Sequence, residues 1–340
     1  MTQDEIEAMV ARYPELIAGA EAAKGMGWYP SGGEVYKFDY MPTVEAVDKF
    51  RDYIFGGIGF EPADYGLTSQ EFRPQYYGNK RPNIDAERLK NYLDVFNASI
   101  KKYYNEIITE HPSRLEDWIE LVRESYDFGG QVLSATIRRH LLVTLIPSIR
   151  FARRAIIIEE MLRQYDVPMP RTIAEIGGGH GRVVRDLLTL MPLETVFYID
   201  LPLNMILAAR FLGHFHPGRV HLVWSEADEP KEGHINIVAP WLIDRIDTPI
   251  DLLINYLSFQ HMSIDALNYY SDRLIRPRVQ VIYHENRDRP REEFDLGAAD
   301  YPFRDAFETL LSRSTGLTVG AQGQSLGVIL AELLVRKNAA

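Results

Sequence analysis

The spacing of apolar residues divides the chain into two parts that meet near Pro170. In residues 1–170, apolar residues recur every three or four positions, which is the period of an amphipathic helix. Thr2 and Glu5 form a capping-box pattern ahead of a helix that runs to about Lys24. The same periodicity predicts further helices over Val44–Ile54, Asp85–Glu110, Ser113–Tyr126, Gln131–Leu145 and Ile149–Tyr165.

Beyond Pro170, short β-branched or apolar runs alternate with helical stretches, which is typical of a parallel sheet with crossover helices. The runs predict strands at Thr172–Ile176, Thr195–Ile199, Val220–Trp224, Ile235–Val238, Asp251–Tyr256 and Arg278–Tyr283. The stretches between them predict helices at Arg182–Leu190, Leu203–Leu212 and Ile264–Leu274. LTVGA (317–321) and VILAELLVRK (328–337), joined by a short turn, predict a hairpin and an antiparallel edge.

The expected fold is therefore α/β, a Rossmann-like and mostly parallel sheet with an antiparallel C-terminal hairpin. We expect two domains. Residues 1–170 would form a helical substrate-binding or lid region, and residues 171–340 a nucleoside-binding domain.

Composition and charge limit the classes of partner that the protein is expected to bind. The formal net charge is -11, whereas a nucleic-acid-binding protein normally carries a basic surface. The acidic N-terminus has no apolar signal region, and no run of about 18 apolar residues predicts a membrane span. The chain has no cysteine, so disulfides and thiolate metal sites are excluded. We expect a cytoplasmic protein that binds neither nucleic acid nor membrane.

A glycine-rich turn, EIGGGHGR (175–182), follows the first predicted strand and opens a helix. The dinucleotide fingerprint G-x-G-x-x-G, counted from Gly177, would need a glycine where Arg182 stands. A Walker-type loop would need a Lys followed by Ser or Thr, and neither follows. Neither phosphate-binding pattern fits, although a structural role in a tight strand-to-helix turn is also open.

Two carboxylates flank this turn. Asp200 ends the next predicted strand, 23 positions after Gly177, where a carboxylate can accept hydrogen bonds from both hydroxyls of a ribose. Glu175 lies in the first strand just before the turn. A negative charge there disfavours a pyrophosphate and suits a ligand that carries an ammonium or sulfonium group.

Glu175, Gly177, Gly179 and Gly181 resemble motif I, E-x-G-x-G-x-G, of the class I S-adenosylmethionine-dependent methyltransferases. The resemblance covers residues 171–340, including the acidic second-strand tip and the terminal hairpin. The segment DLLINYLSFQHMS (251–263) and the helical N-terminal extension are similar to those of sugar O-methyltransferases. The resemblance implies S-adenosylmethionine as cofactor and methyl transfer to a hydroxyl of a sugar or oligosaccharide in polysaccharide biosynthesis. A mannoside and its anomeric 1-hydroxyl are the narrowest expectation.

A sugar hydroxyl is a poor nucleophile, so its methylation needs a general base or a metal such as Mg²⁺. His261, past the predicted strand Asp251–Tyr256, is our first candidate for the base, with a surface histidine as the alternative. His284 and Glu285, in HENRDR (284–289) at the end of the predicted strand Arg278–Tyr283, are further catalytic candidates, with a charged exposed loop as the alternative. Glu285 is the candidate Mg²⁺ ligand or acceptor for a sugar hydroxyl. The resemblance to metal-dependent relatives implies an acid where Asn255 stands, which leaves the metal open.

The remaining candidates are contacts to the ligands. Trp241, after the predicted strand Ile235–Val238, and Asn255, at the end of Asp251–Tyr256, are candidate cofactor contacts, although Trp241 equally suits core packing. The long loop of residues 56–82 offers Tyr76 and Tyr77 to stack on sugar rings and Arg81 to bind hydroxyls, although tyrosines also anchor loops to their own core.

Other functions stay open at this point. The chain could methylate another small hydroxylated or carboxylated metabolite, or bind the cofactor without catalysis. A nicotinamide-dependent oxidoreductase is disfavoured by the glycine spacing. The apolar helix FARRAIIIEEML (151–162) is expected to be buried either in the fold or in a homodimer interface.

Overall fold

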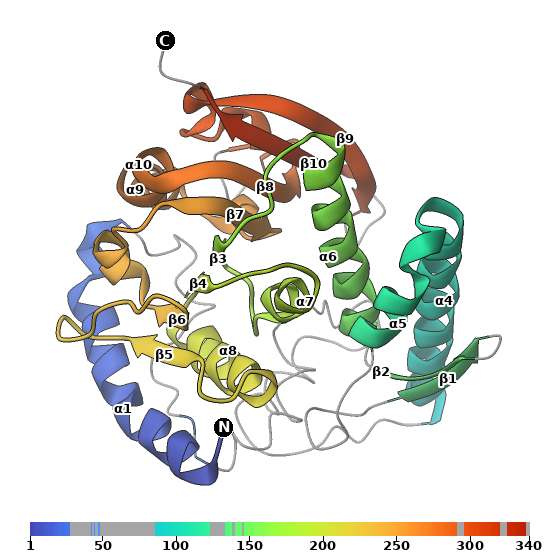
Figure 1. Ribbon diagram of the computed structural model, residues 1–340, viewed down its shortest axis with the longest axis horizontal. Coiled ribbons are helices and arrows are strands. Elements are labelled where there is room, and N and C mark those ends of the chain that lie inside the picture. Colours follow the sequence, from blue (N-terminus) through green and yellow to red (C-terminus); the bar gives the residue numbers. More distant parts are fainter. Residues whose placement is uncertain are drawn as a thin grey trace.

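An eight-stranded sheet forms the centre of the protein, in the order β5-β6-β4-β3-β7-β8-β10-β9 (Figure 1). The computed structural model describes residues 1–27, 42, 44, 47, 86–122, 133–137, 140–144, 146–290, 296–319 and 325–337. The strands are β3 Thr172–Ile176, β4 Thr195–Ile199, β5 Val220–Val223, β6 Ile235–Val238, β7 Ile250–Tyr256, β8 Val279–Arg287, β9 Phe307–Val319 and β10 Ser325–Arg336. Neighbouring strands from β5 to β8 are parallel, and β10 is antiparallel to both β8 and β9. The predicted Rossmann-like sheet with an antiparallel C-terminal hairpin is therefore confirmed.

Helices connect and cover these strands. They are α1 Gln3–Ala22, α4 Ala86–Glu110, α5 Leu115–Val122, α6 Ile146–Gln164, α7 Arg182–Leu190, α8 Pro202–Phe215, α9 Ile264–Tyr270 and α10 Arg276–Arg278. Short helical turns, η5 Pro240–Arg245 and η6 Phe259–His261, lie before and after β7. Among the described helices, none combines the length and apolarity needed to cross a bilayer.

The order of the strands reverses beside β3. The chain passes from β3 to β4 on one side, and it later returns to β7 on the other side of β3. In open α/β sheets, ligands bind outside the carboxyl ends of the strands at such a switch point. The glycine-rich turn follows β3 directly, so it lies at this position.

Helix α1 lies beside the β5 end of the sheet, at the edge opposite the C-terminal hairpin (Figure 1). Its start is fixed by the predicted capping box, because the Thr2 hydroxyl accepts from the Glu5 amide and the Glu5 carboxylate accepts from the Thr2 amide. Arg12 forms an ion pair with Asp228, 2.6 Å away, in the loop that follows β5. These contacts hold α1 on the sheet although it is the first element of the chain.

Helix α6 lies between two apolar cores. One face contributes Phe151 and Ile158 to the main core that surrounds the sheet, and another contributes Ala152 and Ile156 to a smaller core with α4 and α5. The apolar residues of 151–162 are thus buried within the fold, which is the first of the two alternatives predicted for them. The homodimer stays a prediction, and so does the domain boundary after residue 170.

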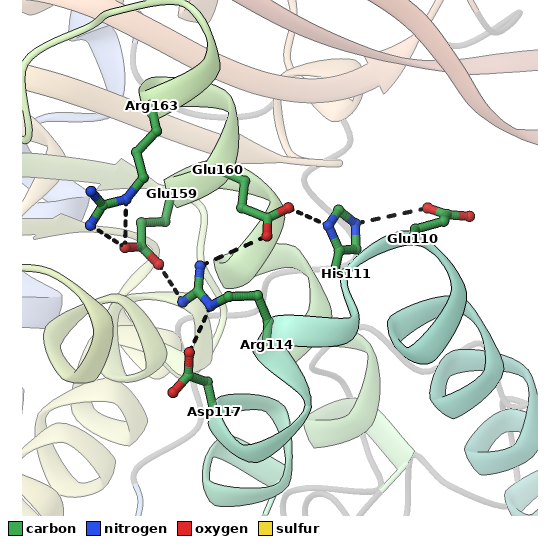
Figure 2. Close-up of polar contacts among 7 residues, drawn as sticks. All are labelled: Glu110, His111, Arg114, Asp117, Glu159, Glu160 and Arg163. Carbon is green, nitrogen blue, oxygen red and sulfur yellow. Dashed lines mark hydrogen bonds and ion pairs between the residues drawn. The ribbon is translucent and has the colours of Figure 1, made fainter.

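Ion pairs add a polar attachment between α6 and the segment that joins α4 to α5 (Figure 2). Arg114 donates to Glu159 of α6 at 2.5 Å and to Asp117 of α5 at 2.6 Å. His111 pairs with Glu160 of α6. Because several charges share these contacts, we expect the network to fix the position of α6 better than isolated surface pairs would.

The prediction of a helix over Gln131–Leu145 is wrong. Residues Leu133–Ile137 and His140–Thr144 form two antiparallel strands, β1 and β2, with Ile137 opposite His140. The β-branched residues of LSATI and HLLVT favour strands, and a connection of two residues is a common hairpin length. The predicted helix Val44–Ile54 lies almost entirely outside the described residues.

Candidate functional site

The glycine-rich turn is conformationally restricted to glycine. Gly177, Gly179 and Gly181 all have positive φ angles, of 70°, 67° and 81°. A Cβ at Gly177 would lie 1.9 Å from the Ser258 Oγ, so the turn after β3 packs closely against the loop after β7. The three predicted glycines therefore allow the tips of two neighbouring strands to meet at the switch point.

Glu175 lies directly beneath this turn. A Cβ at Gly178 would lie 2.2 Å from its Oε2, so only glycine leaves room for the carboxyl group. Glu175 has no exposed surface, and neither carboxyl oxygen has a hydrogen-bond partner among the described residues. Burial, and then the charge of Asp200, raises the pKa of Glu175 to about 8, although the charge of Arg154 opposes the shift.

Asp200 follows β4 and holds the glycine turn in place. Its Oδ2 accepts from the Gly179 amide at 2.8 Å and from the Tyr198 hydroxyl at 3.0 Å. Its Oδ1 accepts from the Leu201 amide at 2.7 Å and from the Asn204 side chain at 2.8 Å. Burial raises the pKa of Asp200 even though these donors favour its charged form. A ribose would share or replace these donors, and ribose binding stays a prediction.

Glu285 faces helix α6. The Arg154 guanidinium grips its carboxylate with two nitrogens, Nε at 2.6 Å and Nη2 at 2.9 Å, and the Tyr283 hydroxyl donates to it at 2.6 Å. Burial alone would raise the pKa of Glu285, but the adjacent Arg154 outweighs burial and the pKa is lowered. The Arg154 guanidinium carbon also lies 3.3 Å from the centroid of the Tyr256 ring, at the end of β7.

The ion pair between Arg154 and Glu285 affects the prediction that Glu285 binds Mg²⁺. HENRDR is not a loop after a strand tip, because residues 284–287 belong to β8 and pair with β10. Both Glu285 oxygens are engaged by Arg154, and no group of three or more His, Asp or Glu side chains in the described part of the chain could hold a metal ion. The prediction that Glu285 binds Mg²⁺ therefore gains no support.

His284 lies on the opposite face of β8 from Glu285, as the alternation of a strand requires. It is fully buried, and its Nε2 lies 3.2 Å from the Glu332 Oε2 of β10. Burial would raise the pKa of Glu332, but hydrogen bonds from His284 and Arg304 lower it to about 2. His284 thus contacts Glu332 across two neighbouring strands, and nothing in its contacts supports a catalytic role.

Two side-chain amides join the strand tips. Asn255 of β7 donates to the Ile176 carbonyl of β3 at 2.8 Å and accepts from the Phe259 amide at 3.1 Å. Asn286 of β8 donates to the Asn255 Oδ1 at 2.9 Å and accepts from the Gln260 amide at 3.2 Å. Asn255 is fully buried, so its observed role is to tie η6 to the switch point, and direct cofactor contact stays a prediction.

His261 is the last residue of η6 and is partly buried. Its Nε2 lies 3.1 Å from the Gln260 Nε2, while the Gln260 Oε1 accepts from the Arg287 amide at 3.1 Å. Because the oxygen of Gln260 is already engaged, its NH₂ group faces the ring, so Nε2 of a neutral His261 acts as acceptor and Nδ1 carries the proton. Proton acceptance at Nε2 therefore requires this contact with Gln260 to break.

The remaining predicted ligand contacts are Trp241, which the structure describes, and three residues that lie outside the described part of the chain. Trp241, in η5, is 8% exposed. Its indole ring packs so closely against Gly19 of α1 that a Cβ at Gly19 would lie only 3.0 Å from ring atoms. This is the packing alternative, and stacking on an adenine stays a prediction. Tyr76, Tyr77 and Arg81 lie outside the described residues.

Sequence reasoning missed Arg154, Gln260 and Asn286. The signal for Arg154 was present, because an arginine within the apolar run FARRAIIIEEML needs a buried partner. Gln260 and Asn286 carried no such signal, since side-chain amides next to histidine or charged residues are ordinary at a surface.

No protein-family model and no curated protein matches this chain. Solved structures do match in part. The ribosomal protein L11 methylase of Lactobacillus delbrueckii subsp. bulgaricus is 13% identical with a TM-score of 0.33, covering 56% of this chain and 80% of its own. TrmK of M. capricolum, in complex with S-adenosylhomocysteine, is 9% identical with a TM-score of 0.33, covering 52% and 68%. The methyltransferase domain of bacterial CtHen1-CN is 13% identical with a TM-score of 0.37, covering 54% and 97%. At these values the likeness says nothing about what this chain binds or does.

Proposed function

We propose that this chain binds S-adenosylmethionine and transfers its methyl group to a hydroxyl of a sugar or oligosaccharide. The observation that carries the proposal is the Glu175 carboxyl group, buried without a hydrogen-bond partner beneath Gly178 at the switch point of the sheet. A buried carboxyl group is costly to ionise unless a positive charge lies nearby. A cationic ligand over the turn supplies that charge, whereas a pyrophosphate would add repulsion.

The residues present fit such a cofactor. Glu175 would face its cationic part, the glycine turn would lie against it, and Asp200 would accept from ribose hydroxyls in place of some of its present donors. When bound, S-adenosylmethionine supplies an electrophilic methyl group on a sulfonium centre. The chain's own part is to hold donor and acceptor at about 3 Å and in line, which accounts for much of the rate of such a displacement.

An acceptor hydroxyl also needs to lose its proton. His261 is the candidate base, because η6 presents it beside the turn that meets Gly177. Its Nε2 would have to exchange the Gln260 contact for the acceptor hydroxyl. General-base catalysis contributes roughly 10²–10⁴-fold to a rate, so this role is measurable.

The first experiment is calorimetry of the full chain with S-adenosylhomocysteine, NAD and NADP. Binding of the adenosylhomocysteine alone supports the proposal, whereas binding of a dinucleotide and none of the methyl-donor product would overturn it. The second is methyl transfer to mannosides, glucosides and phenolics, with and without a chelator. Turnover of mannosides or glucosides supports the sugar assignment, turnover of phenolics alone points to a non-sugar acceptor, and loss of turnover with chelator shows a metal requirement.

The base is tested separately. We expect His261→Ala to lower the turnover rate by about 10²-fold or more with little change in S-adenosylhomocysteine affinity. Full activity of this variant would remove His261 from the mechanism and leave the cofactor assignment intact.

A further inference from the structure

Three buried side-chain amides connect the end of β3 to His261. They belong to Gln260, Asn286 and Asn255, of which Gln260 is 6% exposed and the two asparagines are fully buried. Buried amide groups in native proteins nearly always have hydrogen-bond partners. The partners of these three are one another, backbone groups and the ring of His261, so together they fix the surroundings of the candidate base.

The orientation of the Gln260 side chain follows from its contacts. Its Oε1 accepts from the Arg287 backbone amide at 3.1 Å, and its Nε2 lies 3.1 Å from the His261 Nε2. A carboxamide turned by half a rotation would bring its NH₂ group against the Arg287 N–H, which places two donors together. The side chain is only 6% exposed, so little water could replace the lost contact. The NH₂ group therefore faces the ring.

The backbone of Gln260 is held from the other side. Its amide donates to the Asn286 Oδ1 at 3.2 Å, and the Asn286 side chain donates to the Asn255 Oδ1 at 2.9 Å. Asn255 in turn donates to the carbonyl of Ile176, the residue before Gly177, at 2.8 Å. The turn η6 is thus tied to β8, β7 and β3, and Gln260 has little freedom to move away from His261.

The contact with Gln260 decides which ring nitrogen of His261 can take a proton. A neutral imidazole has one N–H donor and one acceptor nitrogen, whereas an NH₂ group can only donate. Facing that group, Nε2 is the acceptor and Nδ1 carries the proton. The hydroxyl of a methyl acceptor is also a donor, so it can replace the amide at Nε2 without a change of tautomer. An acceptor nitrogen at this position is what a general base needs.

We propose that Gln260 is a positioning residue, which selects the tautomer of His261 and so makes Nε2 the nitrogen that takes the proton of the acceptor hydroxyl. This inference rests on the proposed function, because it takes His261 as the base. The proton passes from the hydroxyl oxygen to Nε2 while that oxygen bonds to the methyl carbon, and the electron pair of the broken carbon–sulfur bond stays on sulfur. His261 ends as an imidazolium, and the sulfonium charge is lost.

Nitrogen NMR of the full wild-type chain tests the tautomer directly. The protein is labelled with ¹⁵N-histidine and measured without ligand at about pH 8, where a histidine with an ordinary pKa is neutral. The chain has nine histidines, and the signals missing from His261→Ala identify the ring. We expect the proton on Nδ1 and none on Nε2. A proton on Nε2 would overturn the inference, whatever the activity of the enzyme.

Two substitutions at Gln260 separate positioning from a merely structural role. Gln260→Glu keeps an oxygen for the Arg287 amide but turns an acceptor toward His261, so Nε2 should become protonated. Its turnover should fall about 10²-fold, as for His261→Ala, with little change in S-adenosylhomocysteine affinity. Gln260→Met loses both contacts and leaves the tautomer unselected. Its turnover should stay within about 10-fold of the wild type, because the orientation supplied by one hydrogen bond is lost.

A structural role predicts the opposite order of activities. If Gln260 only held η6 against β8, Gln260→Glu would keep that contact and remain more active than Gln260→Met. That order, or a Gln260→Met ring that keeps the wild-type tautomer, would overturn the inference. Gln280→Glu adds the same charge at an exposed position near the other end of β8. It is the matched control and should keep the wild-type turnover and tautomer.

Failure of the proposed function gives a different result. A wild-type chain that binds no S-adenosylhomocysteine, or that transfers no methyl group to any hydroxyl, would refute that function, while the NMR spectra would still report the contact between Gln260 and His261. Full turnover of His261→Ala would overturn the inference and leave the cofactor assignment standing.

Discussion

Glu175 should make the stability of the protein depend on pH in an unusual direction. Its pKa is about 8 in the folded state against an ordinary 4.5, so between these values the folded protein binds more protons at this site than the unfolded chain does. Stability from this group is therefore fully present below pH 4.5 and is lost as the pH rises through about 8. Glu175→Gln replaces this carboxyl group by an amide that does not titrate. At low pH the variant and the wild type therefore carry the same charge at this site.

The magnitude follows from the shift. A difference of about 3.5 pKa units, at 1.36 kcal/mol per unit, corresponds to about 5 kcal/mol as an upper limit. Between about pH 6 and about pH 9, the same linkage gives a loss of about 3 kcal/mol in the wild type relative to Glu175→Gln. This is a large part of the 5–15 kcal/mol, roughly, that stabilises a typical protein.

The assay is urea unfolding of both proteins across this pH range, with the difference in free energy of unfolding as the readout. We expect the free energy of unfolding of Glu175→Gln to rise relative to that of the wild type as the pH rises. Glu194→Gln, which removes a half-exposed carboxylate paired with Arg171, is the control and should show the same difference at both ends of the range. A wild-type-to-Glu175→Gln difference that changes by less than about 1 kcal/mol would refute the reasoning, because the carboxyl group would then be solvated or paired.

Three further predictions concern the Glu175 site and the start of α1. At pH 7 about 0.9 of the Glu175 carboxyl groups are protonated, so S-adenosylhomocysteine should release nearly one proton on binding, and none in Glu175→Gln. Calorimetry in buffers of different ionisation enthalpy measures this release, and a value near zero in the wild type would contradict it. Gly178→Ala should weaken the binding of S-adenosylhomocysteine by at least about 10-fold, because the new Cβ would lie 2.2 Å from the Glu175 Oε2. Unchanged affinity would show that the turn adapts. Thr2→Ala should lower the free energy of unfolding by about 1 kcal/mol through loss of the capping box, as measured by urea unfolding, and no change would show that the start of α1 frays.

The central sheet could be predicted from the sequence because its signals are local. Each of the runs at 172–176, 195–199 and 235–238 is short, apolar and bounded by turn residues, and the structure confirms all three to the residue. The hairpin at 133–144 could not be predicted in the same way. Its apolar residues match helical and strand spacing about equally well, and β-branched residues decide the outcome only weakly.

The site could be predicted only as far as residues near the strand ends. Glu175, Asp200 and the glycines follow from position along a strand, and the structure brings them together beside β3. His284 and Glu285 were placed at the end of β8, but the pairing of β10 extends that strand through Arg287. The extension depends on a hairpin some 40 positions further along the chain, so no local pattern around residue 284 reveals it.

Arg154 shows why the rest of the site lies beyond local patterns. Which residue of a helix reaches a strand tip depends on how the helix is rotated and how far it is shifted along its axis. For α6 both are set by two cores and by ion pairs such as Arg114–Glu159, formed by residues far away in the sequence (Figure 2). A change of one residue in this register would turn Arg154 by about 100° away from Glu285. The helical N-terminal half therefore contributes to the site through the placement of one helix, and weakening its attachment should reach Glu285 and the tip of β7 through the contacts of Arg154.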